Sequence, residues 1–232
     1  MGVCSENVKF GIQYFLSLRK QSNHPSQKPN TENRFTFRTV EFSQTLDLYS
    51  KTISMKQITV PSYDQVDDAA KVVFDYFKKI AGKMPNLYAT IGYSSNALSS
   101  YTAFIQAQAK GTFHAKDREG IFLIVSELNG CQYCLASHTA SAKKNGWTEE
   151  ETLQLRAGKS PDRKWQVIYL IIKSIIESKG AAGEGVLEEF TAIGYNEAAL
   201  MDLMALIIGM TFTNYVYRLT HIPIDFPLAK PL

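Results

Sequence analysis

Cysteine is scarce in this chain of 232 residues, and long apolar runs are missing. Of three cysteines, Cys4 stands alone and the other two lie three residues apart, which makes a poor disulfide framework for a secreted protein. No stretch of about 18 uninterrupted apolar residues suggests a transmembrane helix. The short apolar run at residues 10–18 has no small-residue cleavage site after it, which argues against a signal peptide. We therefore expect a cytoplasmic protein.

Excess charge is also small and unevenly placed. The formal net charge of +3 lies entirely in residues 1–54, which carry seven Lys and Arg against four Asp and Glu. Residues 55–232 carry eighteen of each sign and are neutral. Because no basic patch marks this main part of the chain, we expect neither a nucleic-acid nor a membrane partner.

The composition divides the chain near Met55. Residues 20–35, KQSNHPSQKPNTENRF, are polar, contain proline and lack an apolar period, which predicts disorder. The basic, serine-containing leader suits a targeting segment; we favour the alternative that Met55 is the natural start. The predicted domains are a disordered or non-native extension at residues 1–54 and one domain at residues 55–232.

The second domain is predicted to be helical almost throughout. Apolar residues recur at spacings of three and four over residues 66–81, as one helix face requires, and strand-like alternation is nearly absent. Thr148 and Glu151 form a capping box, Ser160-Pro161 suits a helix start, and Asn196 suits an N-cap. The fold class is therefore all-α. We predict helices at residues 66–81, 86–92, 97–109, 116–128, 131–144, 149–157, 161–179, 186–192 and 197–218.

The most informative stretch is ELNGCQYCLASH at residues 127–138. On one helix, Cys131, Cys134 and His138 fall on a single stripe, with neighbouring Cβ atoms about 5–6 Å apart. Asn129-Gly130 places both cysteines in the first turn, where unpaired N–H groups and the helix dipole favour a thiolate. His138 can exchange a proton with Cys134. The stretch thus supplies a nucleophile, a partner thiol and a base.

Four interpretations of this cluster compete. Structural zinc needs a fourth ligand, and the other histidines are scattered, so we expect no metal. A structural disulfide suits a cytosolic chain poorly. Both cysteines can also be small apolar core residues. We favour a thiol redox or peroxidatic site. A thioredoxin-like site would follow a strand, whereas a helix is predicted here.

The stretch EGIFLIVSELNGCQYCLASH, from Glu119 to His138, resembles the AhpD-like alkylhydroperoxidases of the carboxymuconolactone decarboxylase superfamily. The shared pattern is a glutamate twelve residues before a CxxCxxxH motif, on all-α subunits. The resemblance runs from about residue 60 to NYVYRLTHIPIDFP, while residues 1–54 have no counterpart. The chain departs from some members at Tyr133, where they have a histidine.

The resemblance implies a role for each motif residue. Cys134 would be the peroxidatic thiolate that reduces an organic hydroperoxide to an alcohol and becomes a sulfenic acid. Cys131 would donate a proton and close the disulfide, and Glu119 and His138 would form a proton relay. No cofactor is implied. A dithiol reductant protein, lipoyl-bearing in well-known members, would reset the site, and the subunits would form a homo-oligomer, a trimer or hexamer.

Two other functions stay open at this point. A carboxymuconolactone decarboxylase-type enzyme would use acid/base chemistry, for which the cysteine pair is unnecessary, and a non-catalytic stress-related protein would leave its thiols unused. Three further residues are lesser candidates for the site: Glu127 on the preceding helix, and Tyr217 and His221 near the C-terminus. Trp147 and Trp165 are expected in the core.

Overall fold

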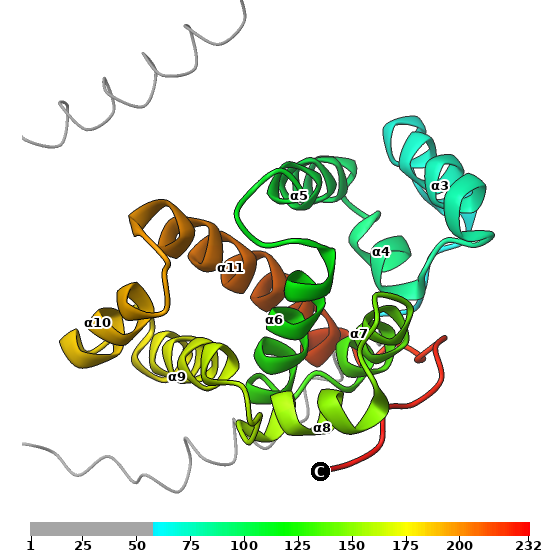
Figure 1. Ribbon diagram of the computed structural model, residues 1–232. Helices are drawn as coiled ribbons and strands as arrows, with labels where there is room; N and C mark the ends of the chain where they lie inside the picture. The colour runs from blue at the N-terminus through cyan, green and yellow to red at the C-terminus, as the bar shows by residue number, and fades with distance from the viewer. Residues whose placement is uncertain (1–57) are drawn as a thin grey trace, which may run out of the picture. The chain divides into compact units, whose positions relative to one another are not determined.

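The computed structural model describes residues 58–232, and the predicted extension at residues 1–54 lies outside these described residues (Figure 1). Every regular element within residues 58–232 is a helix, which confirms the all-α prediction. The elements are the 3-10 helix η2 (Tyr63–Gln65) and the α-helices α3 (Asp68–Ala81), α4 (Asn86–Ile91), α5 (Ser95–Gln108), α6 (Ala115–Leu128), α7 (Gln132–Lys144), α8 (Glu149–Ala157), α9 (Arg163–Ser178), α10 (Glu184–Ala192) and α11 (Glu197–Thr220).

Helix α6 is the central element of the domain. It packs against α7, α8, α9 and α11, which surround it in Figure 1. Its residues 121–125, IFLIV, are all buried, as expected for a helix that has neighbours on every side. Helix α3 packs against α5 at the edge, around a smaller cluster that includes Phe74 and Leu98.

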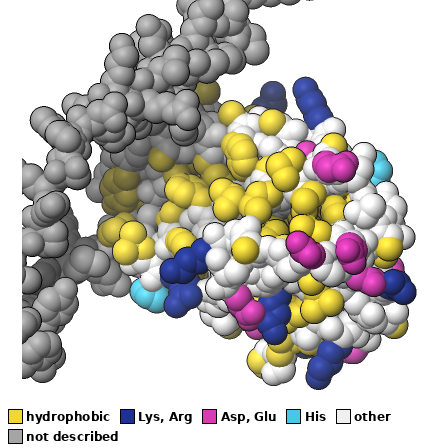
Figure 2. All heavy atoms as spheres, turned by 90° about the vertical axis from the view of Figure 1, so that its left-hand side faces the viewer, with side chains coloured by type: hydrophobic (Ala, Val, Ile, Leu, Met, Phe, Trp, Pro, Cys, Tyr) yellow, Lys and Arg dark blue, Asp and Glu magenta, His cyan; other side chains and the backbone are white. Residues whose placement is uncertain are grey.

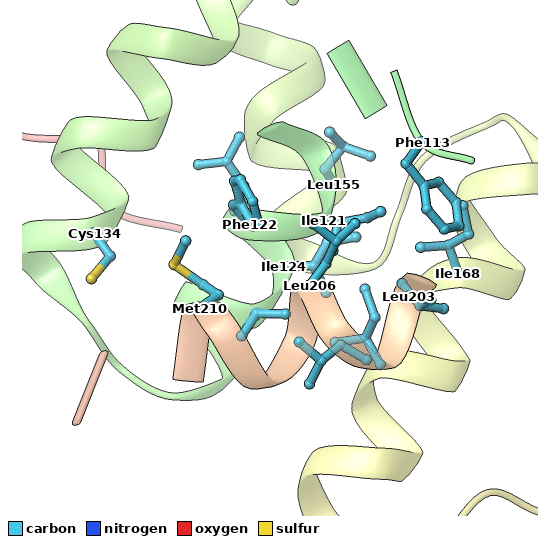
Figure 3. Packing of buried hydrophobic residues seen from close by; sticks show 14 of the residues in the cluster. Phe113, Ile121, Phe122, Ile124, Cys134, Leu155, Ile168, Leu203, Leu206 and Met210 are labelled. Atoms are coloured by element: carbon cyan, nitrogen blue, oxygen red, sulfur yellow. The ribbon is translucent and has the colours of Figure 1, made fainter. Parts of the chain in front are cut away.

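The main core joins α6 to α11, and the cysteine pair lies at its edge. Leu203 and Leu206 of α11 meet Ile121 of α6 in one cluster of buried side chains (Figure 3). Met210, farther along α11, lies between this group and Cys134 in the same view. Apolar burial, worth about 1.5–3 kcal/mol for each large side chain, therefore holds the two helices beside the cysteines.

The two tryptophans belong to the same core, as predicted. Trp147 and Trp165 are both buried, and their rings meet edge to face with centroids 5.2 Å apart. The Trp147 indole N–H donates to the Lys116 carbonyl oxygen at 2.8 Å, which satisfies the polar end of that side chain.

Helix α11 is long and apolar enough to span a membrane by length and composition alone. Its most apolar 18-residue window has a mean hydropathy of 1.5, and 44% of that window is buried inside the domain. The helix packs against α4, α5, α6 and α7. The sides of α11 that face these helices must be apolar, which accounts for part of its composition.

Two of the predicted helix starts are confirmed. Thr148 and Glu151 form the capping box of α8, in which the Glu151 carboxylate accepts from the Thr148 N–H at 2.7 Å. The Asn196 side chain accepts from the Ala199 N–H at 3.0 Å and begins α11. In both cases a side-chain oxygen pairs with an N–H group that the helix leaves free.

Two other predicted starts are wrong by two residues. Helix α9 is capped by Asp162, whose carboxylate accepts from the Lys164 N–H at 2.8 Å, and not by Ser160-Pro161. A carboxylate competes better than a hydroxyl for the free N–H groups at the positive end of a helix. Helix α3 likewise begins after Asp67, and Val66 is extended.

Candidate active site

The two cysteines of the motif form a disulfide at the start of α7. Cys131 has an extended backbone and caps the helix, its sulfur accepting from the Cys134 N–H at 3.2 Å. The prediction that Cys131 lies inside the helix is therefore wrong by one position. The cause is Gly130, whose positive φ of 66° turns the chain just before it. Both sulfurs are buried, with Cys131 and Cys134 exposed by 0% and 2%.

The predicted glutamate and histidine meet across α6 and α7. His138 Nδ1 and Glu119 Oε2 are 2.8 Å apart, and both side chains are largely buried. Because an ionised carboxylate can only accept, Nδ1 carries the hydrogen and Nε2 is left to exchange a proton. The imidazole ring also packs on Phe122 with centroids 4.9 Å apart. The Glu119 side chain and the Phe122 ring together fix the orientation of the histidine.

A small cavity of about 60 Å³ opens beside this pair. Cys134 and His138 line the cavity, whereas Cys131 and Glu119 do not. Space of this size admits a few water-sized groups. The cysteines thus occupy unequal positions, with Cys134 facing the cavity and Cys131 behind it. Its lining residues are Pro85, Leu87, Tyr88, Tyr101, Ile105, Phe122, Tyr133, Cys134, Ser137, His138, Met210, Thr213 and Phe226.

Two tyrosines that the sequence analysis missed line the same cavity. Tyr88 of α4 and Tyr101 of α5 have ring centroids 5.8 Å apart. Burial raises the pKa of both phenols, that of Tyr101 strongly. Both groups therefore keep their protons at neutral pH. Nothing in their spacing separates them from ordinary core residues.

Tyr133, between the two cysteines, joins the cavity to distant parts of the chain. Its hydroxyl accepts from the Leu87 N–H at 3.1 Å and donates to Asp225 Oδ1 at 2.6 Å. The other carboxylate oxygen of Asp225 accepts from Lys83 Nζ at 2.8 Å. Burial, and then the bond to Asp225, raise the pKa of Tyr133. Its single proton is committed to Asp225, so this phenol positions α7.

A buried amide network holds the turn that precedes Cys131. Asn129 Nδ2 donates to Asn214 Oδ1 at 2.9 Å, and Asn214 Nδ2 donates to Ser126 Oγ at 3.3 Å. Arg218 then donates to the Asn129 carbonyl oxygen at 2.9 Å. Asn214 is fully buried on α11, so this helix fixes the backbone from which α7 begins. The sequence contains no spacing signal for this role.

The three lesser candidates lie outside the cavity. Glu127 binds the buried Arg156 at 2.7 Å instead of facing the cysteines, because the helix turn directs it toward α8. His221 is exposed and ends α11 with a positive φ of 48°. Tyr217 packs against Tyr133 with ring centroids 5.7 Å apart and does not reach the cavity. Within residues 58–232, no group of three or more His, Cys, Asp or Glu side chains is placed to hold a metal ion.

The fold and the site define a class: an all-helical domain with a cysteine pair at a helix start and a histidine–glutamate pair beside it. Residues 96–168, which contain the whole motif, match the sequence model of the carboxymuconolactone decarboxylase family. This match and the shared helical fold agree with the resemblance to AhpD-like proteins found in the sequence. No curated protein matches the chain.

Solved structures share the fold at low sequence identity. An uncharacterized peroxidase-related protein from Silicibacter sp. TM1040 is 20% identical, with a TM-score of 0.62 over 75% of this chain and 93% of that one. An AhpD-core peroxidase-related protein from Ralstonia eutropha JMP134 is 15% identical, with a TM-score of 0.62 over 72% and 90%. A variant of the debrominase Bmp8, bound to 2,3,4-tribromopyrrole, is 16% identical, with a TM-score of 0.61 over 72% and 91%.

Proposed function

We propose that this protein is a thiol-dependent peroxidase that reduces organic hydroperoxides through a dithiol/disulfide cycle. One observation carries the proposal: Cys134 faces a cavity that it shares with His138, while Cys131 lies behind it within bonding reach. A cavity-facing thiol with a base beside it is placed to attack. A second thiol at its back is placed to resolve the product.

The first step oxidises Cys134. His138 Nε2 takes the Cys134 proton, and the thiolate attacks the terminal oxygen of the hydroperoxide and breaks the O–O bond. The sulfur becomes a sulfenic acid, and the departing alkoxide takes the proton from His138 to give the alcohol. Glu119 keeps Nδ1 protonated throughout. The protonated phenols of Tyr88 and Tyr101 are available to stabilise the departing oxygen.

The second step closes the disulfide. Cys131 gives up its proton, and its sulfur attacks the sulfenic sulfur of Cys134 and expels hydroxide, which leaves as water. One hydroperoxide and two thiols thus give one alcohol, one water and one disulfide. A dithiol reductant protein, such as one bearing a lipoyl group, reduces the disulfide to two thiols and is itself oxidised to a disulfide. We place the cycle in the cytoplasm, where such reductants keep cysteines reduced.

A thiol titration tests this cycle. The reduced chain has three thiols, and one equivalent of an organic hydroperoxide should leave only Cys4. The Cys134→Ser variant should keep both of its thiols and consume no hydroperoxide. The proposal fails if the wild-type chain retains all three thiols, or if Cys134→Ser consumes hydroperoxide equally well. Because one protein of this fold is a debrominase, 2,3,4-tribromopyrrole should be assayed in parallel as a competing substrate.

The homo-oligomer expected from the family resemblance also enters as a proposal. Five apolar side chains of α11 share one face at spacings of seven, four, three and four, and each is 38–63% exposed. Apolar side chains gather on the side of the molecule seen in Figure 2, which is the side of α9, α10 and α11 in Figure 1. Contact with another copy would remove this surface from water. Sedimentation velocity of the full chain measures the oligomeric state and so tests this proposal. The five residues are Met201, Ile208, Phe212, Tyr215 and Leu219.

A further inference from the structure

The segment after α11 folds back over the candidate active site. In Figure 1 this red segment passes beside α7 and α8. Three separate contacts hold it. The Asn86 side chain donates to the Pro223 carbonyl oxygen at 3.1 Å, Lys83 and Tyr133 bind the Asp225 carboxylate, and Arg156 donates to the Lys230 carbonyl oxygen at 2.7 Å. Residues 222–232 therefore form a strap that is tied to helices far away in the sequence.

Phe226 is the side chain by which this strap reaches the cavity. It is one of the residues that line the cavity together with Cys134. Its ring and that of Tyr133 form a T-shaped pair with centroids 5.6 Å apart, and Lys83 Nζ lies 5.0 Å from the Phe226 ring centroid. The same lysine binds the neighbouring Asp225. Lys83 thus holds both the ring and the carboxylate next to it.

The cavity walls differ in how firmly they are held. Phe122 and Met210 come from α6 and α11, which are packed together in the core. Phe226 comes from a segment without regular structure, and its neighbour Leu228 is 74% exposed. The Lys83 side chain is 52% exposed, and a half-exposed ion pair contributes little to stability. Moving the strap therefore requires far less rearrangement than moving either helix.

We infer that Phe226 is the specificity-determining wall of the site, and that the Lys83–Asp225–Tyr133 contacts are the latch that holds it in place. With the latch closed, the cavity of about 60 Å³ admits only small groups to Cys134. With Phe226 removed or the latch opened, bulkier reactants reach the thiol. In terms of the proposed function, the latched ring selects hydroperoxides whose organic group is compact beside the O–O bond.

Access to Cys134 can be measured without any peroxidase activity. The full chain is prepared with Cys4→Ser and Cys131→Ser, so that Cys134 is its single thiol. Its rate of modification is measured with a compact reagent, methyl methanethiosulfonate, and a bulky one, N-phenylmaleimide. Phe226→Ala should raise the bulky-to-compact rate ratio by about tenfold, which corresponds to about 1.4 kcal/mol in activation free energy. Lys83→Met should raise it by a smaller factor.

Matched variants keep this test decisive. Phe104→Ala removes a similar ring that is 39% exposed on α5 and does not line the cavity, and it should leave the rate ratio unchanged. Phe226→Leu retains most of the packing, so it should fold even if Phe226→Ala fails to fold. Its bulky-to-compact rate ratio should lie between those of wild type and Phe226→Ala. Equal ratios in wild type, Phe226→Leu and Lys83→Met would overturn the inference.

A second arm separates this inference from the proposed function. The same substitutions in the chain with all three cysteines are assayed with ethyl hydroperoxide, which is compact beside the O–O bond, and with the bulkier cumene hydroperoxide. A shift in the modification ratio together with no reduction of any hydroperoxide would contradict the peroxidase proposal and leave the wall assignment standing. Hydroperoxide reduction together with an unchanged modification ratio would support the peroxidase proposal and contradict the assignment of Phe226 as the specificity-determining wall.

Discussion

The two sides of the cavity are built in different ways. On one side, Cys134 and His138 come from α7, and Glu119, which contacts His138 without lining the cavity, comes from the helix just before it. On the other side, Tyr88 and Phe226 come from parts of the chain that are more than 130 residues apart. The first side holds the groups that can exchange protons and electrons. The second side holds apolar and phenolic surface that shapes the space around them.

This difference explains why residues of one side can be recognised in the sequence and those of the other cannot. Cys131, Cys134 and His138 keep fixed spacings at the start of one helix and along it, so helix geometry brings them together. Glu119 lies on the preceding helix, and only the resemblance in sequence indicated it. The groups of the other side meet only through tertiary packing, so no local spacing reports them. If this division is correct, substitutions on the first side should change mainly the chemistry, and those on the second side mainly shape and stability.

The largest effect is expected from Glu119→Gln. The amide can present its NH₂ group to His138 Nδ1 and so favour the tautomer that is wrong for proton exchange at Nε2. The rate of hydroperoxide reduction should fall by about 10²- to 10⁴-fold, the usual contribution of general acid–base catalysis. Stopped-flow measurement of thiol oxidation gives this rate. Glu150→Gln, an exposed change on α8, is the control. An unchanged rate in Glu119→Gln would remove the relay from the mechanism.

Asn214→Leu should instead affect stability. It leaves the Asn129 amide and the Ser126 hydroxyl without their buried partner, at about 1–3 kcal/mol for each unpaired group. Urea unfolding measures the loss. Thr211→Val, which removes only the 3.3 Å contact to Asn129, should cost less. Equal stability of Asn214→Leu and wild type would show that this network does not hold the turn before Cys131.

Tyr133→Phe should change how stability depends on pH. Burial raises the pKa of Tyr133 above its ordinary value of about 10. Its contribution to stability is fully present below pH 10 and is lost as the pH rises from there through the raised native pKa, because the unfolded phenol ionises first. Urea unfolding from neutral to alkaline pH should show a shallower alkaline loss in Tyr133→Phe. Tyr76→Phe, a half-exposed control, should keep the wild-type slope.

The smallest effect on stability is expected from Lys83→Met. The ion pair with Asp225 is half exposed on the lysine side, so its loss should change the free energy of unfolding by less than about 1 kcal/mol. Urea unfolding at low and high salt measures this change. A large loss would make Lys83 a structural support of the domain and would contradict the inference that the strap is easily moved.

The sequence predicts the helical fold well, because apolar spacing and end signals are local. The Thr148–Glu151 capping box and the Asn196 cap are confirmed within the chain itself. The start of α9 fails for a physical reason: three polar or proline residues precede it, and their order does not reveal which side chain accepts the free N–H groups. Cys131 is misplaced by one position because the turn at Gly130 depends on backbone dihedrals.

The candidate site is predictable in its motif and unpredictable in its surroundings. The Glu119–His138 contact follows from the resemblance in sequence, and the structure shows it at 2.8 Å. The sequence did not indicate that Glu127 faces Arg156, because the two residues are 29 positions apart and meet only through the packing of α6 against α8. The Asp225–Tyr133 bond joins residues 92 positions apart, and only the packed fold reveals it.

The most direct test asks which sulfur receives the oxygen. The reduced full chain carrying Cys131→Ser is treated with one equivalent of an organic hydroperoxide in the presence of dimedone, and so is the chain carrying Cys134→Ser. Mass spectrometry of the peptides then locates the sulfenic-acid adduct. We predict an adduct on Cys134 in the first variant and none on Cys131 in the second. An adduct on Cys131 in Cys134→Ser, with Cys134 unmodified in Cys131→Ser, would contradict it.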